Sequence, residues 1–192
     1  MSELNQSTRV TLSSVNTLDP NRPASMLSAH ELLGFMSPSL AMEILTYAYE
    51  NDKPIYRATL NAVAEARKLR PVYFERQPKP QRHAAMLVSL ARPALDAVTS
   101  GLIRAWLLKK HKAMLTDFLD ALGIKHEDGV VDDLPPAMDD AKLKAAVETL
   151  LAKYPPETVA VYLHSFNEMN EQEWPNLATL LNADARLQLG AA

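Results

Sequence analysis

The sequence predicts an all-α protein, a multi-helix bundle of about seven to eight helices preceded by a mobile N-terminal arm. From Ser28 onward, apolar residues recur at spacings of three and four, the period of an amphipathic helix. The thirteen prolines fall between these periodic segments or in their first turns, where a helix accepts proline. No segment after residue 28 shows the strict alternation that is typical of a strand.

The chain is expected to form one helical domain, residues 28–192, because a protein of this size buries about 70% of its unfolded surface. Two sub-lobes, 28–123 and 137–192, joined by an acidic loop, are the alternative organisation. Residues 1–27 are rich in Ser, Thr and Asn and predict a flexible arm. Within the arm, residues 8–15 alternate enough to form a short strand if they dock.

The first helices of the domain have recognisable starts. Ser37 is an N-cap residue followed by Pro38 at the first helical position. Asp52 is expected to cap the next helix, with Pro54 in its first turn. The prolines within residues 71–80 predict an irregular connector, after which another helix begins.

The longest element is expected over residues 93–122 and ends before Gly123, which suits the left-handed position after a helix. Unbroken, it would span about 40 Å at 1.5 Å per residue, so we expect a bend within residues 109–112. An acidic loop follows over residues 125–138.

Three more helices complete the predicted bundle. Asp139 or Asp140 is expected to cap the first of them. Pro156 and Pro175 each stand where a helix begins, and the residues after them are apolar at helical spacing. Tyr162 and Phe166 keep this spacing and are predicted to be core.

The net charge of −3 conceals an uneven distribution along the chain. Residues 53–112 carry thirteen Lys or Arg against three acidic residues, a net charge of +10. Residues 113–192 have a net charge of −9 and residues 1–52 one of −4. This pattern predicts a surface that binds a polyanion, or two complementary faces that meet within or between chains.

Two basic groups, one with interleaved aromatics, are therefore candidates for binding an anion or a partner. Cations beside aromatic rings on an irregular segment can hold phosphates and stack bases. The alternative is that these charges offset helix dipoles and are otherwise solvated. The candidates are Arg67, Lys68, Arg70, Tyr73, Phe74, Arg76, Lys79, Arg82, Lys109, Lys110 and Lys112.

Several site chemistries are excluded or unsupported. The chain has no cysteine, which excludes disulfides, thiolate zinc sites and cysteine nucleophiles. The five glycines are too far apart for a phosphate-binding loop, and no His-x-x-x-His pair occurs. Residues 126–133 concentrate oxygen ligands but lack the spacing of a calcium loop, so cation binding there is left open. No catalytic residue, metal ligand or cofactor is predicted.

Residues 97–102 fit part of a helix-turn-helix motif in the spacing of Ala97, Gly101 and Leu102. The next helix would then offer polar side chains to base edges. It offers Ile103, Ala105 and Trp106 instead, which are typical of core, and only Arg104 is suitable for contacting a base.

These observations favour a non-catalytic helical interaction or adaptor protein that binds a protein partner or itself through a charge-polarised surface. A nucleic-acid-binding protein that uses residues 53–112 is the alternative, and an enzyme comes third with no motif to support it. We expect a cytoplasmic protein without a membrane span, since no apolar run approaches about 20 residues and the N-terminus does not resemble a signal peptide.

Overall fold

The computed structural model describes residues 27–172 and 174–190, which form ten α-helices, two 3₁₀ turns and no strand. The all-α prediction is therefore confirmed, although the described residues hold more helices than the seven to eight expected. The predicted arm and the predicted strand at residues 8–15 lie outside the described residues, apart from Leu27. The elements are α1 (Ala29–Phe35), α2 (Pro38–Asn51), α3 (Lys53–Ala66), α4 (Pro71–Glu75), α5 (Lys79–Leu90), η1 (Pro93–Leu95), α6 (Asp96–Lys110), α7 (Lys112–Ala121), α8 (Asp140–Lys153), α9 (Pro156–Met169), α10 (Pro175–Ala183) and η2 (Ala185–Leu187).

Two expected segments account for the additional helices. The prediction of an irregular connector was wrong for Pro71–Glu75, because these residues form the short helix α4. Pro71 occupies the first helical position, where its missing N–H costs no hydrogen bond, and the fully buried Phe74 holds the turn against the core. The long element divides at His111 into α6 and α7, within the segment where a bend was expected.

The predicted helix boundaries follow from their caps. Ser37, Asp52 and Asp139 each accept a hydrogen bond from a backbone N–H three residues further on, at 3.3, 3.4 and 2.9 Å. Such a bond satisfies one of the backbone donors that the first turn of a helix leaves unpaired. Gly123 follows α7 with φ of +63°, the left-handed conformation expected for it.

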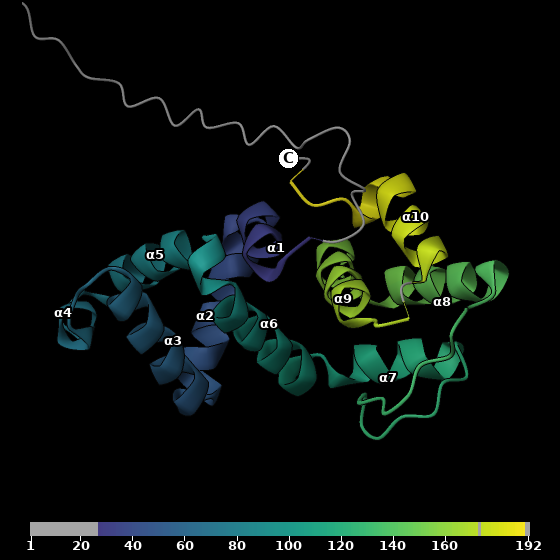
Figure 1. The fold of residues 1–192 in the computed structure, drawn as a ribbon, viewed down its shortest axis with the longest axis horizontal. Coiled ribbons are helices and arrows are strands. Elements are labelled where there is room, and N and C mark those ends of the chain that lie inside the picture. Colours follow the sequence, from purple (N-terminus) through teal and green to yellow (C-terminus); the bar gives the residue numbers. More distant parts are fainter. Residues whose placement is uncertain (1–26, 173, 191–192) are drawn as a thin grey trace, which may run out of the picture.

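The helices form two groups that are joined through α6 and α7 (Figure 1). On one side, α6 packs against α1, α2 and α3, and α4 lies at the far end beyond α3. On the other side, α7 packs against α8, and α9 packs against α10 and η2. Every residue of α9 from Thr158 to Asn167 is buried, so α9 is the central helix of this second group. The two groups share one continuous hydrophobic core, and α1 also contacts α9.

No single helix of the described chain has both the length and the apolar composition needed to cross a membrane. Lys79–Leu90 and Pro93–Lys110 satisfy these criteria only as a pair, and they are bent by 103° relative to each other.

Candidate functional site

The basic residues predicted to bind an anion or a partner lie in separate groups, and these groups differ in their contacts with the rest of the chain. Lys109, Lys110 and Lys112 lie at the junction of α6 and α7, apart from α4 (Figure 1). Each of the three forms an ion pair with a carboxylate of this chain, so this group offers little unbalanced charge to a partner. The pairs are Lys109 with Asp52 (2.5 Å), Lys110 with Glu43 (2.6 Å) and Lys112 with Asp128 (2.6 Å).

Arg67 and Phe74 support the structure from within. The Arg67 Nε donates a hydrogen bond to the Ser89 hydroxyl at 2.7 Å, which ties the end of α3 to α5. Its guanidinium lies 5.9 Å from the centre of the Phe74 ring, and Phe74 is fully buried. Phe74 is therefore not available to a partner, and the half-buried Arg67 is engaged by Ser89 and Phe74 of the same chain.

Lys79 and Arg82 lie over an aromatic cluster that includes Tyr49 and Tyr56. The Lys79 ammonium is 4.6 Å from the centre of the Tyr49 ring and 2.9 Å from a carboxylate oxygen of Glu50. The Arg82 guanidinium lies 5.5 Å from the Tyr49 ring and 5.9 Å from the Tyr56 ring. These cation–π contacts were not evident from the sequence because the tyrosines and the cations come from three different helices.

His83 completes this cluster, with its ring centre 5.6 Å from those of both Tyr49 and Tyr56. Burial, together with the positive charges of Arg82 and Lys79, lowers the pKa of His83 from 6.5 to about 4. His83 is therefore neutral near pH 7, and the charge on this face is carried by the two cations.

The remaining basic residues surround an exposed apolar surface at one end of the molecule. Leu69, Val72 and Tyr73 are 38%, 42% and 53% exposed, and exposed apolar side chains that gather in one place can mark an interaction site. The cations beside them are exposed, and none forms a hydrogen bond or ion pair through its side chain with the described residues. We call this surface the α4 tip, and it consists of Lys68, Leu69, Arg70, Val72, Tyr73 and Arg76.

Local backbone geometry makes the α4 tip project. Lys68 follows α3 with φ of +56°, a left-handed conformation that turns the chain away from the helix. The Leu69 N–H donates to the Ala64 carbonyl at 2.8 Å, which closes this turn. Arg70 then stands in extended conformation before Pro71, and the chain enters α4.

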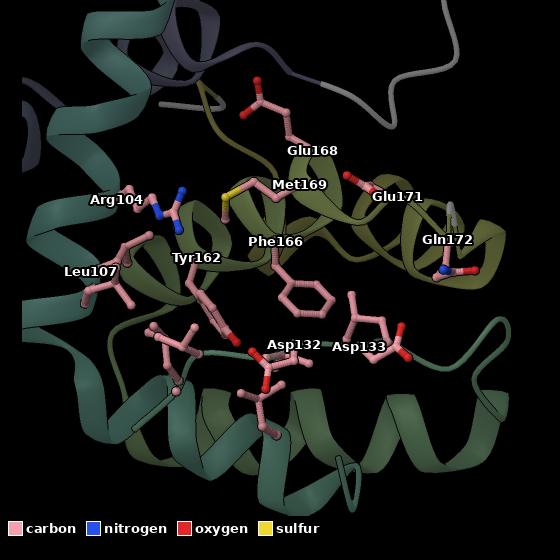
Figure 2. A pocket seen from close by; sticks show the side chains of 17 residues that line it. Arg104, Leu107, Asp132, Asp133, Tyr162, Phe166, Glu168, Met169, Glu171 and Gln172 are labelled. Carbon is pink, nitrogen blue, oxygen red and sulfur yellow. The ribbon is translucent and has the colours of Figure 1, made fainter. Parts of the chain in front are cut away.

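A second feature of the structure is a cavity of about 620 Å³ between α6, α7, α9 and residues 129–134 of the acidic loop (Figure 2). Its walls are mainly apolar and aromatic. Tyr162 and Phe166 point into it from α9 (Figure 2). The loop contributes Val130, Val131 and Leu134 to its lining. The sequence placed Tyr162 and Phe166 in the core, and they are buried, but the position of the loop opposite them was not predictable.

The polar groups that line this cavity differ in environment. The Tyr162 side chain is only 4% exposed, and its hydroxyl has no hydrogen-bond partner within the described part of the chain. Burial raises the pKa of Tyr162 well above 10.0. Arg104 reaches the cavity from α6, and Asp132 and Asp133 reach it from the loop (Figure 2). Burial, followed by the charge of Asp96, raises the pKa of the Glu168 carboxyl above 4.5.

One side-chain group has the composition of a catalytic triad but not its geometry. The Ser28 hydroxyl and the Asp96 carboxylate lie 2.9 and 2.7 Å from the same ring nitrogen of His30, Nδ1. A catalytic triad needs the hydroxyl on one nitrogen and the carboxylate on the other. The Ser28 hydroxyl also donates to Glu31, so this group ties the start of α1 to α6.

The described residues contain no group of three or more acidic or histidine side chains arranged to hold a metal ion. In the acidic loop, Asp128 pairs with Lys112, and Glu127 forms an isolated backbone bridge with Val130. His164 is buried and its Nε2 lies 3.2 Å from the Leu187 carbonyl, which links α9 to η2.

A comparison with known proteins identified no relative of this chain. No protein-family model matches it, and neither a curated protein nor a solved structure matches it significantly. The α4 tip and the cavity are the two features of the described residues that suggest a function.

Proposed function

We propose that this chain is a non-catalytic interaction protein that docks an acidic protein segment carrying apolar side chains on the α4 tip. The observation that carries this proposal is the combination of Leu69, Val72 and Tyr73, all exposed, with three unpaired cations around them. Apolar side chains inside a charged rim are the usual anatomy of a protein interface, and complementary charge sets its orientation.

The same observation favours a protein over a nucleic acid as the partner. An exposed Tyr73 could stack on a base, and the cations could contact phosphates. Leu69 and Val72, however, have no counterpart on a phosphate backbone but fit the apolar side chains of a peptide. Substituting the apolar residues of the α4 tip is therefore expected to lower the affinity for the partner, as is removing its cations.

Binding to three labelled probes of equal length tests the proposal by fluorescence anisotropy. The first is a peptide with the sequence of residues 125–138, which combines four acidic residues with valines and a leucine. The second is a peptide of the same charge in which these apolar residues are serine. The third is a single-stranded DNA of fourteen nucleotides. The first probe should bind most tightly at low salt.

Variants of the α4 tip separate the contributions. Val72→Ser and Tyr73→Ser remove exposed apolar surface. Each should lower the affinity for the first probe by about tenfold and leave the fold intact. Lys68→Gly removes a cation from a left-handed position that glycine adopts without strain, so it should weaken binding without lowering stability. Lys110 is paired with Glu43 and lies outside the α4 tip. Lys110→Ala is therefore the matched control and should have little effect on the affinity for the first probe.

Two results would reject the proposal. One is the absence of binding to the first probe at low salt. The other is tighter binding to DNA with a salt slope of about −0.7 per phosphate contacted and no response to Val72→Ser, which would identify a nucleic-acid-binding surface. Light scattering over the micromolar range shows whether the segment comes from a second copy, since self-docking makes the mass depend on concentration.

A further inference from the structure

The cavity between α6, α7 and α9 is independent of the α4 tip, because no residue of the tip lines it. Its volume of about 620 Å³ falls within the range of about 300–1,000 Å³ typical of small-molecule sites. The walls formed by Leu107, Leu115, Leu119 and Phe166 suit an apolar ligand body.

Tyr162 is a polar group placed for a ligand at the floor of this cavity. Its side chain is 96% buried and points into the cavity from α9, and its hydroxyl has no partner among the described residues (Figure 2). The hydroxyl is not one of the fully buried, unpaired side-chain atoms of the described residues, so it is accessible from the cavity. A polar atom of a ligand in the cavity can therefore form a hydrogen bond with it.

The charged residues of the lining favour a cation over an anion. Asp132 and Asp133 of the loop and Glu171, which follows α9, are exposed carboxylates at the rim. Arg104 is the single cation among the described residues that line the cavity. In addition, the aromatic rings of Tyr162 and Phe166 present faces that attract a positive charge.

We propose that this cavity binds a small hydrophobic organic amine as its ammonium cation. The apolar body of the amine packs against the leucines and Phe166. Its ammonium group donates hydrogen bonds to the Tyr162 hydroxyl and to the Asp132 carboxylate, and Asp133 adds negative charge at the rim. A carboxylate of the same shape is excluded by the surplus of acidic groups around the rim.

Three ligands with one carbon skeleton test the charge preference on the full chain at pH 7: 4-phenylbutylamine, 4-phenylbutanol and 4-phenylbutyrate. Isothermal titration calorimetry gives their affinities. The Trp174 ring lies 5.6 Å from the Phe166 ring, so tryptophan fluorescence reports binding independently. The amine should bind about tenfold more tightly than the alcohol, a ratio typical of one charge-assisted hydrogen bond, and more tightly still than the carboxylate.

Single substitutions then identify the site. Tyr162→Phe removes a hydroxyl that has no protein partner, so the protein should remain folded while the amine binds about tenfold more weakly. Asp132→Asn, at an exposed position, should weaken amine binding without affecting folding. Arg104→Gln should strengthen it by removing repulsion. Glu127→Gln, on the same loop but not in the cavity lining, is the control and should leave affinity unchanged.

The proposal is overturned if 4-phenylbutyrate binds as tightly as the amine, or if none of the three ligands binds at millimolar concentration. It is also overturned if Tyr162→Phe and Asp132→Asn, shown by urea unfolding to be folded, retain the affinity of the unmodified chain for the amine. Neither result bears on the α4 tip, whose probes are peptides and DNA.

Discussion

Lys109 reaches from the end of α6 to Asp52, with 2.5 Å between its Nζ and the Asp52 Oδ2. The same Asp52 carboxylate accepts the hydrogen bond that caps α3. One buried side chain therefore starts a helix and neutralises a cation of the basic segment. The hydrogen bond from Lys109 is the main cause that lowers the pKa of Asp52 below 3.8.

Replacing Asp52 should separate its two roles. Asp52→Asn keeps a capping oxygen but removes the charge, and should reduce the free energy of unfolding by less than about 1 kcal/mol, since Lys109 is half exposed. Asp52→Ala also removes the cap and should cost about 1–2 kcal/mol more. Urea unfolding at pH 7 measures both. Folding lowers the pKa of Asp52, so the unmodified chain should be more stable than Asp52→Asn above pH 3.8. This difference in the free energy of unfolding should vanish as the pH falls through the pKa that Asp52 has in the folded protein. An advantage that persists at pH 2 would contradict the pairing.

His83 should make the stability of the protein depend on pH between 6.5 and about 4. The unfolded chain binds a proton at this residue below pH 6.5, whereas the folded protein does so only near pH 4. The stability that the neutral His83 contributes is thus fully present above pH 6.5. It is lost as the pH falls through this window, which lowers the free energy of unfolding by up to about 3 kcal/mol. Urea unfolding of the unmodified chain and of His83→Leu at a series of pH values measures this difference. An NMR titration in which the His83 ring protonates near pH 6.5 would refute it.

Two glycines should respond in opposite ways to alanine. Gly129 has φ of +87°, and a Cβ there would lie 3.1 Å from the Leu115 Cβ. Gly129→Ala should therefore destabilise the protein by about 1–2 kcal/mol, the cost of a left-handed conformation for an L residue. Gly101, inside α6, has open space where a Cβ would lie. Gly101→Ala should stabilise by about 0.5–1 kcal/mol, because glycine is the poorer helix former. Thermal unfolding compares the two, and equal effects would contradict the assignment.

Trp174 should hold the acidic loop in place. Its Nε1 donates a hydrogen bond to the Pro135 carbonyl at 2.8 Å, and its ring is buried against Phe166. Trp174→Phe should lower the free energy of unfolding by about 2 kcal/mol, from lost packing and one hydrogen bond. It should also increase the hydrogen exchange of the amides within residues 130–134.

Trp106 provides the matched control for this prediction, because it is equally buried but its Nε1 has no hydrogen-bond partner among the described residues. Trp106→Phe should cost less and leave exchange in the loop unchanged. Faster loop exchange in both variants would show that general loosening, and not the bond to Pro135, is responsible.

Helix starts were predictable because their causes are local. Ser37, Asp52 and Asp139 cap the helices assigned to them, and Gly123 adopts the left-handed conformation expected after α7. The segment Pro71–Glu75 was predicted wrongly. Pro71, Pro78 and Pro80 indicate breaks in the chain, whereas the short helix depends on the burial of Phe74 and on packing of α4 against α3.

The sequence by itself determined an all-α fold, the caps that divide it into helices, and a basic middle segment. These depend on residues within one or two turns of each other. Only the tertiary structure decided which charges remain available. It pairs Lys109, Lys110 and Lys112 with acids from distant segments, leaves Lys68, Arg70 and Arg76 around exposed apolar residues, and sets the acidic loop against α9 to form a cavity. The physical reason is that ion pairs and cavities depend on distances between segments, which only packing establishes.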